Sequence, residues 1–95
     1  MSTQSIQNRI RTVQREIESL QRRLASKSKD EASKSGRIAQ IKRSITKNTS
    51  PSTLQSKLRQ IEALENDITR IQQDKTDLTK RIADKTAELH RHQQD

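Results

Sequence analysis

The sequence predicts an all-α fold, specifically a long antiparallel two-helix coiled-coil hairpin. Apolar residues recur every three or four positions on both sides of the single proline, Pro51. None of the 95 residues is Phe, Tyr or Trp, the side chains that usually supply the bulk of a globular core. A polar stretch at 47–52 separates two periodic halves of similar length. A 4-3 apolar spacing held this long is typical of helices that pair along a narrow seam.

Disorder is the alternative, since only 26% of the residues are hydrophobic and 34% are charged. The regular spacing of the apolar residues argues against it, because disordered polar chains show no helical period. The predicted helix–helix interface consists of Ile6, Ile10, Val13, Ile17, Leu20, Leu24, Ile38, Ile41 and Ile45 in the first half, and Leu54, Leu58, Ile61, Leu64, Ile68, Ile71, Leu78, Ile82 and Leu89 in the second.

We expect one hairpin over residues 1–95, with helix one at about 3–46, a turn at 47–52 and helix two at about 52–92. Asn48 can take the left-handed conformation that closes a helix. Ser50 can cap the second helix, with Pro51 at its first position, where the missing amide hydrogen costs nothing. Ser52 with Gln55 forms a competing capping box, which leaves the start open by about two residues.

A heptad register follows from the apolar spacing. In helix one, positions 10, 17, 24, 31, 38 and 45 are a, and positions 6, 13, 20, 27, 34 and 41 are d. In helix two, positions 54, 61, 68, 75, 82 and 89 are a, and positions 57, 64, 71, 78, 85 and 92 are d. Parallel pairing of one extended helix with its copy would use the same stripes and stays open.

Folding about the turn brings charged g positions together and predicts three ion pairs: Arg9 with Glu88, Glu16 with Arg81, and Arg23 with Asp74. Such edge pairs select a register rather than hold it, because each contributes less than about 1 kcal/mol. The same register places Asp30 opposite Asp67, an unfavourable pairing.

Several charged residues fall on core positions, among them Lys27, Glu31, Lys34, Lys57 and Lys85. Their alkyl stems can cover apolar neighbours, yet a lone hairpin this polar is marginally stable. A stripe of small residues also runs along helix one at Ala25, Ser28, Ala32, Ser35 and Ala39. We therefore expect self-association into a dimer or a helical bundle, or a larger parent protein that supplies the missing burial.

Enzymatic and cofactor-dependent functions are not expected. The only histidines, His90 and His92, are two residues apart on a helix and cannot hold a metal jointly. Gly36 is the only glycine, so a phosphate-cradling loop cannot form, and the chain has no cysteine. No apolar run is long enough for a membrane span or a signal peptide, and we expect a soluble cytoplasmic protein.

Nucleic-acid binding is the alternative function. Residues 1–47 carry twelve Lys and Arg against four acidic residues, whereas residues 48–95 carry eight of each sign. Arg15, Arg22, Lys29 and Arg43 occupy outer f positions and are the candidate phosphate contacts. The lack of aromatic residues excludes base stacking, so such binding would be indifferent to sequence.

The segment TSPSTLQSKLRQIEALENDITRIQQDKTDLTKRIADKTAELHRHQ, from Thr49 to Gln93, resembles the N-terminal coiled-coil region of bacterial Toll/interleukin-receptor-like (TIR-like) domain proteins. The upstream segment IESLQRRLASKSKDEASKSGRIAQIKRSI is similar to the first helix of such regions. The resemblance implies a self-association module that clusters an effector domain in signalling or antiviral defence. The effector itself has no counterpart in these residues.

Overall fold

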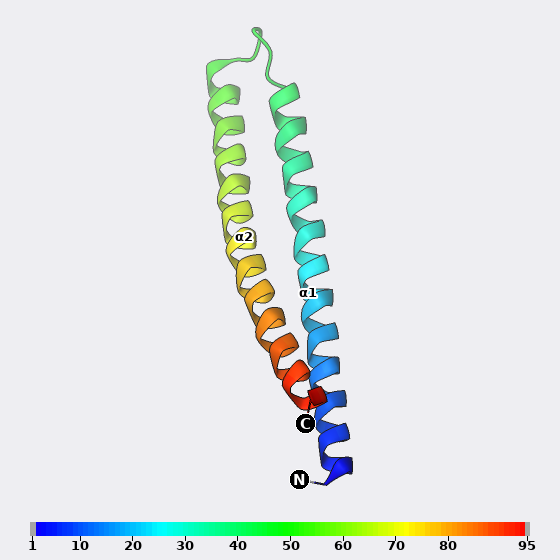
Figure 1. The fold of residues 1–95 in the computed structure, drawn as a ribbon. Helices are drawn as coiled ribbons and strands as arrows, with labels where there is room; N and C mark the ends of the chain where they lie inside the picture. Colours follow the sequence, from blue (N-terminus) through cyan, green and yellow to red (C-terminus); the bar gives the residue numbers. More distant parts are fainter. Residues whose placement is uncertain (1, 95) are drawn as a thin grey trace. The chain divides into compact units, whose positions relative to one another are not determined.

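The computed structural model describes residues 2–94 and consists of two helices, α1 (Thr3–Arg43) and α2 (Pro51–Gln94), without strands in this range. The all-α helical hairpin predicted from the sequence is confirmed. Figure 1 shows α1 in blue to cyan-green, the short connection in green, and α2 from green to red. Neither described helix contains an apolar stretch long enough to span a bilayer.

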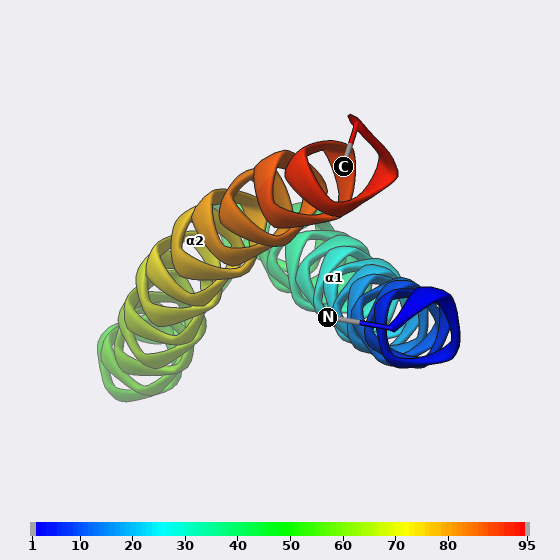
Figure 2. The same cartoon turned by 60° about the horizontal axis from the view of Figure 1, so that its bottom comes forward.

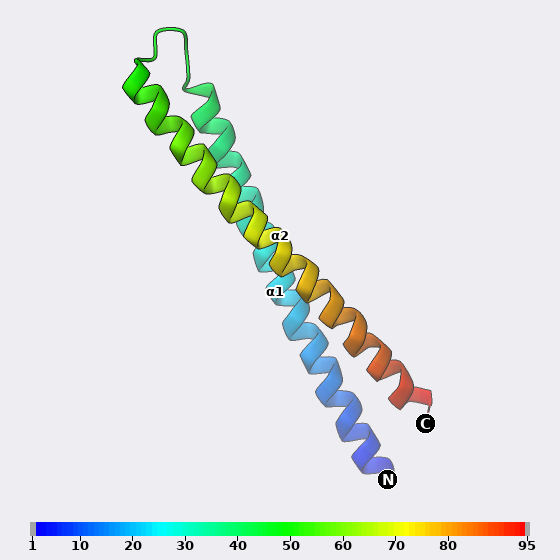
Figure 3. The same cartoon turned by 90° about the vertical axis from the view of Figure 1, so that its left-hand side faces the viewer.

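The chain divides into two compact units. Unit 1 comprises Met1–Ser26 and Lys75–Asp95, and unit 2 comprises Lys27–Asp74. Each unit pairs a segment of α1 with a segment of α2 that runs in the opposite direction (Figures 1 and 3). Unit 1 contains the beginning of α1 and the end of α2, which come forward in Figure 2. Unit 2 contains the turn.

The N-terminus of each helix is closed by a serine. At α1 the Ser5 amide donates to Ser2 Oγ at 3.1 Å. At α2 the Thr53 amide donates to Ser50 Oγ at 3.3 Å, and the Leu54 amide donates to the Ser50 carbonyl at 2.8 Å. These bonds satisfy amide hydrogens that have no partner within the first helical turn. The predicted Ser50 cap with Pro51 at the first helical position is confirmed, and the competing start at Ser52 is wrong.

The turn begins earlier than predicted, since α1 ends at Arg43 rather than at Thr46. Side-chain hydroxyls form hydrogen bonds with the backbone here in place of helical amides. Ser44 Oγ donates to the Ile41 carbonyl at 2.6 Å. Thr49 Oγ1 accepts from the Thr46 amide at 2.9 Å, and the Thr49 amide donates to the Thr46 carbonyl at 3.1 Å. Such side-chain bonds offer the chain an alternative to another helical turn.

The left-handed conformation predicted for Asn48 is wrong, because no residue in the described part of the chain has a positive φ. The Asn48 amide instead donates to Thr46 Oγ1 at 3.3 Å. Threonine hydroxyls therefore close the turn without the backbone strain that a positive φ would bring. At the other end of the chain, α2 continues to Gln94, two residues beyond the predicted end.

Candidate functional site

The apolar seam between the helices is the first candidate site, and it follows the predicted heptad. Every described a and d position is buried or half-buried. In unit 1 the buried side chains are Val13, Leu20 and Leu78, with Val13 only 1% exposed. In unit 2 they are Ile61 and Ile71. The seam therefore packs α1 against α2 within each unit, as knobs-into-holes periodicity requires.

One predicted interface residue lies outside the seam. Leu58 is 50% exposed, whereas the other predicted interface residues are buried or half-buried. Leu58 follows the d position 57 and so occupies position e, where a two-stranded interface leaves the side chain beside the seam rather than in it. Leu58 was included in the predicted interface because it is apolar, although its heptad position e already indicated a location beside the seam.

Charged contacts along the seam were only partly predicted. Arg9 Nη2 lies 3.6 Å from Glu88 Oε1, which confirms that ion pair. The other two predicted pairs are wrong, because their carboxylates are held by lysines. Glu16 contacts Lys85 instead of Arg81.

Asp74 contacts Lys27 at 3.1 Å instead of Arg23. The unfavourable pairing of Asp30 with Asp67 is relieved in the same way. Asp67 contacts Lys34 at 3.6 Å across the interface and Arg70 at 3.2 Å on its own helix. The acidic g positions of α2 in unit 2 are therefore neutralised by lysines from core positions of α1.

These contacts share one geometry, in which a lysine at a d position reaches a g residue of the opposite helix. We call them the lysine rungs: Lys27–Asp74, Lys34–Asp67, Lys57–Ser44 and Lys85–Glu16. In all four the two residue numbers add up to 101.

In the Lys57 rung, the ammonium donates to Ser44 Oγ at 2.8 Å and to the Ser44 carbonyl at 3.1 Å. A lysine stem lies along the apolar seam while its ammonium extends past the edge to an oxygen. Through the lysine rungs, the lysines that interrupt the apolar seam thus form contacts between the two helices.

Lys85 and Glu88 form the centre of a charged cluster in unit 1. Lys85 contacts both Glu16 and Glu88, and His92 Nε2 lies 3.7 Å from Glu88 Oε1. The hydrogen bond to Glu16 raises the pKa of Lys85 above 10.5, although partial desolvation opposes this.

Desolvation by itself would raise the pKa of Glu88, but the hydrogen bond and charge of Lys85, together with Arg9, lower it below 4.5. Both shifts favour the charged forms. They move both groups away from proton exchange near neutral pH, so this cluster is suited to holding helices rather than to acid–base chemistry.

The second candidate site is the set of four cations at f positions. Arg15 and Arg22 are exposed in unit 1, and Lys29 and Arg43 are exposed in unit 2. Arg43 Nε donates to the Ala39 carbonyl at 3.3 Å. None of the four forms an ion pair with another described residue. Each guanidinium or ammonium therefore stays available for an external anion.

In the described range, no three His, Asp or Glu side chains come close enough together to hold a metal ion. No family model, curated protein or solved structure matches this chain.

Proposed function

We propose that this chain is a non-enzymatic coiled-coil assembly module that binds further copies of itself through its Ile/Leu seam. One observation carries the proposal: most of the seam is only half-buried by the helix pairing within each unit. A fully buried Leu or Ile stabilises a fold by roughly 1.5–3 kcal/mol, and a half-buried one gains only part of this. Helices from a second copy would cover the remaining apolar surface.

The resemblance of Thr49–Gln93 to coiled-coil regions of bacterial TIR-like proteins extends this proposal. In such an arrangement, the module clusters an effector domain in a longer parent protein and acts in cytoplasmic signalling or defence. The resemblance is the only support for the effector, since the described residues form two helices and nothing else.

Sedimentation equilibrium over a wide range of protein concentrations tests self-association. Assembly through Ile and Leu side chains should persist at about 1 M salt, where the Debye length is about 3 Å and surface charges are screened. Association should also raise the melting temperature with protein concentration, because the oligomer is linked to folding by mass action. A chain that stays helical and monomeric throughout the range contradicts the proposal.

The half-buried Ile68 allows a directed test in unit 2. Ile68→Asp places a carboxylate on the surface that a second copy would cover and should abolish assembly. Gln73→Asp introduces the same charge at an exposed position of the same helix and should leave assembly intact. Circular dichroism separates loss of assembly from loss of helix. Equal effects of the two variants on assembly would show that the seam does not mediate it.

Sequence-indifferent nucleic-acid binding is the second candidate function, and the four exposed f-position cations favour it. Binding through them should weaken with salt, with a log–log slope of about −0.9 per phosphate contact. The triple variant Arg15→Gln, Arg22→Gln, Arg43→Gln should lose DNA retention.

A control variant removes three cations from exposed positions of α2 (Arg59→Gln, Lys80→Gln, Arg91→Gln) and changes the net charge equally. Equal losses in both triple variants would indicate net charge rather than the f-position cations of α1. Unchanged retention in the first would exclude this candidate.

A further inference from the structure

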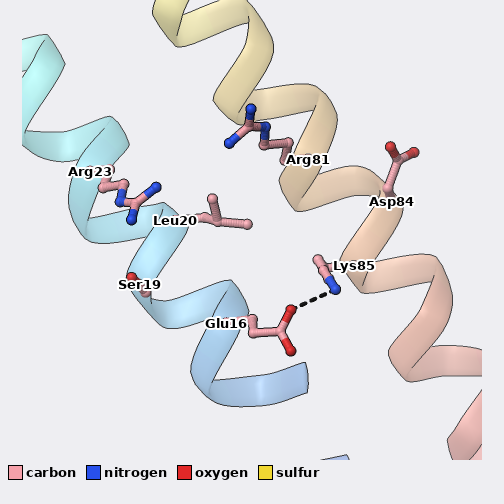
Figure 4. Close-up of a pocket in the computed structure, with 7 residues that line it drawn as sticks. All are labelled: Glu16, Ser19, Leu20, Arg23, Arg81, Asp84 and Lys85. Atoms are coloured by element: carbon pink, nitrogen blue, oxygen red, sulfur yellow. Dashed lines mark ion pairs between the residues drawn. The ribbon is translucent and has the colours of Figure 1, made fainter. Parts of the chain in front are cut away.

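Unit 1 contains a groove between α1 and α2 with a volume of about 380 Å³ (Figure 4). This volume lies within the range of small-molecule sites. Leu20 is 9% exposed and forms an apolar part of the wall. The lining residues are Glu16, Ser19, Leu20, Arg23, Arg81, Asp84 and Lys85.

Two arginines from opposite helices, Arg23 and Arg81, extend into the space between the helices (Figure 4). Neither forms an ion pair with any other residue of the described range. The lysine rungs explain this, because Lys85 holds Glu16 and Lys27 holds Asp74, the carboxylates expected to pair with the two arginines. The groove is thus left with two guanidinium groups that have no ion-pair partner.

The remaining charges of the groove do not neutralise these arginines. Glu16 and Lys85 neutralise each other, as the ion pair in Figure 4 shows. Asp84 also lines the groove but forms no ion pair with either arginine, so three cations (Arg23, Arg81 and Lys85) face two carboxylates (Glu16 and Asp84) and one positive charge remains. Two like charges that face one open space repel each other, and an anion between them would turn this repulsion into attraction.

The chemistry of the guanidinium group identifies the anion. Its planar donors match the oxygens of phosphate and carboxylate in a bidentate manner. A phosphate group offers oxygens in several directions and carries up to two charges, which suits it to two guanidinium groups that line one groove. Ser19 also lines the groove and carries a hydroxyl donor. With no aromatic residue in the chain, no nucleobase can be held by aromatic stacking.

We propose that this groove binds a small phosphate-bearing anion between Arg23 and Arg81. The ligand is recognised by its phosphate, which is either free or the terminal group of a small ester. This site is separate from the f-position cations, and it does not depend on the assembly proposed above.

Titration with inorganic diphosphate at constant ionic strength tests the site, with backbone amide chemical shifts as the readout. The largest shifts are expected at residues 19–23 and 81–85, and binding should saturate. Diffuse shifts over all basic residues of α1 would overturn the proposal. This arm needs no variant and does not depend on how substitutions affect folding.

Arg23→Gln and Arg81→Gln should each weaken diphosphate binding about tenfold or more, because each removes hydrogen bonds to a charged group. Arg11→Gln is the matched control, since Arg11 is exposed on the same helix of unit 1, carries the same charge and does not line the groove. Equal weakening by all three variants would show that net charge, rather than the groove, determines diphosphate binding, and would overturn the proposal. Arg23→Lys and Arg81→Lys should each keep only part of the affinity, because an ammonium lacks the planar fork of donors.

Orthophosphate, diphosphate and glycerol phosphate distinguish the two sources of the phosphate. Tighter binding of glycerol phosphate than of orthophosphate indicates a small ester whose organic part contacts the wall at Leu20. The reverse order, with diphosphate tightest, indicates the free anion. Failure of all three to bind at millimolar concentration overturns the proposal.

Discussion

Lys85 on α2 and Glu16 on α1 form an ion pair across the interface of unit 1, in which a cation at a d position contacts a carboxylate at a g position of the opposite helix. The same relationship joins Lys27 to Asp74 and Lys34 to Asp67 in unit 2. The polar residues of this seam thus favour one register, because each lysine contacts its oxygen acceptor only when the two helices are aligned in that register.

Exchange of the two charges in a rung tests this relationship. Lys27→Glu and Asp74→Lys should each lower the free energy of unfolding by about 1 kcal/mol, because each replaces an attraction with a repulsion. The double variant should recover the wild-type value to within about 0.5 kcal/mol, measured by urea denaturation. Lys29→Glu, at an exposed position, controls for net charge. Additive losses in the double variant would show that the rung has no energetic role.

The charged cluster of unit 1 predicts how stability depends on pH. The pKa of Glu88 is lowered in the folded state, so its contribution is complete above pH 4.5 and is lost as the pH falls through the lowered value. The pKa of Lys85 is raised, so its contribution is complete below pH 10.5 and is lost as the pH rises through the raised value. Melting temperatures measured from acidic to alkaline pH should show both losses.

Glu88→Gln isolates the acidic part of this profile. The variant should melt at a lower temperature than the wild type at neutral pH, and the two curves should converge at acidic pH, where Glu88 is protonated. Glu18→Gln is the control, because Glu18 is exposed and forms no ion pair with other described residues. A constant difference between wild type and Glu88→Gln at all pH values would contradict the assignment.

When apolar side chains are truncated, the loss in the free energy of unfolding should follow how deeply each side chain is buried rather than how hydrophobic it is. Val13→Ala should lower the free energy of unfolding by about 1–2 kcal/mol, because Val13 is 1% exposed and alanine only partly compensates through its helix propensity. Leu58→Ala should change it by less than about 0.5 kcal/mol, since half of that side chain is already exposed. Urea denaturation below the concentration of any self-association gives both values. The opposite order would place Leu58 in the seam after all.

The two serines beside Pro51 should differ in their effects. Ser50→Ala removes the acceptor for the Thr53 amide and should cost about 1 kcal/mol of stability. Ser52→Ala lies inside the first turn of α2 and should have an effect within about 0.5 kcal/mol. Thermal denaturation of both variants under the same conditions compares them directly. Equal losses would restore Ser52 as a competing cap.

Sequence periodicity and turn chemistry predicted the fold because each depends on local rules. The 4-3 spacing determined which faces of α1 and α2 pair, and Ser50 with Pro51 predicted the start of α2. The end of α1 was predicted three residues too late. Its position depends on hydroxyl bonds of Ser44, Thr46 and Thr49, whose competition with the helix no propensity scale describes.

The charged contacts were harder to predict because several pairings were available to each carboxylate. Glu16 could contact Arg81 at a g position or Lys85 at a d position, and only the packed side chains show that it contacts Lys85. The two arginines that line the groove of unit 1 follow from this choice, so the groove could not be predicted from the sequence. A rule that also tests d-to-g pairs would have offered the Lys85–Glu16 contact as an alternative pairing.

The lysine rungs also bear on which partners this chain rejects. In a parallel dimer each d residue meets its own counterpart, so Lys27, Lys34, Lys57 and Lys85 would each face an identical ammonium. Four such repulsions disfavour the side-by-side rod that the apolar stripes alone permit. The lysines that interrupt the apolar stripe therefore disfavour the parallel orientation.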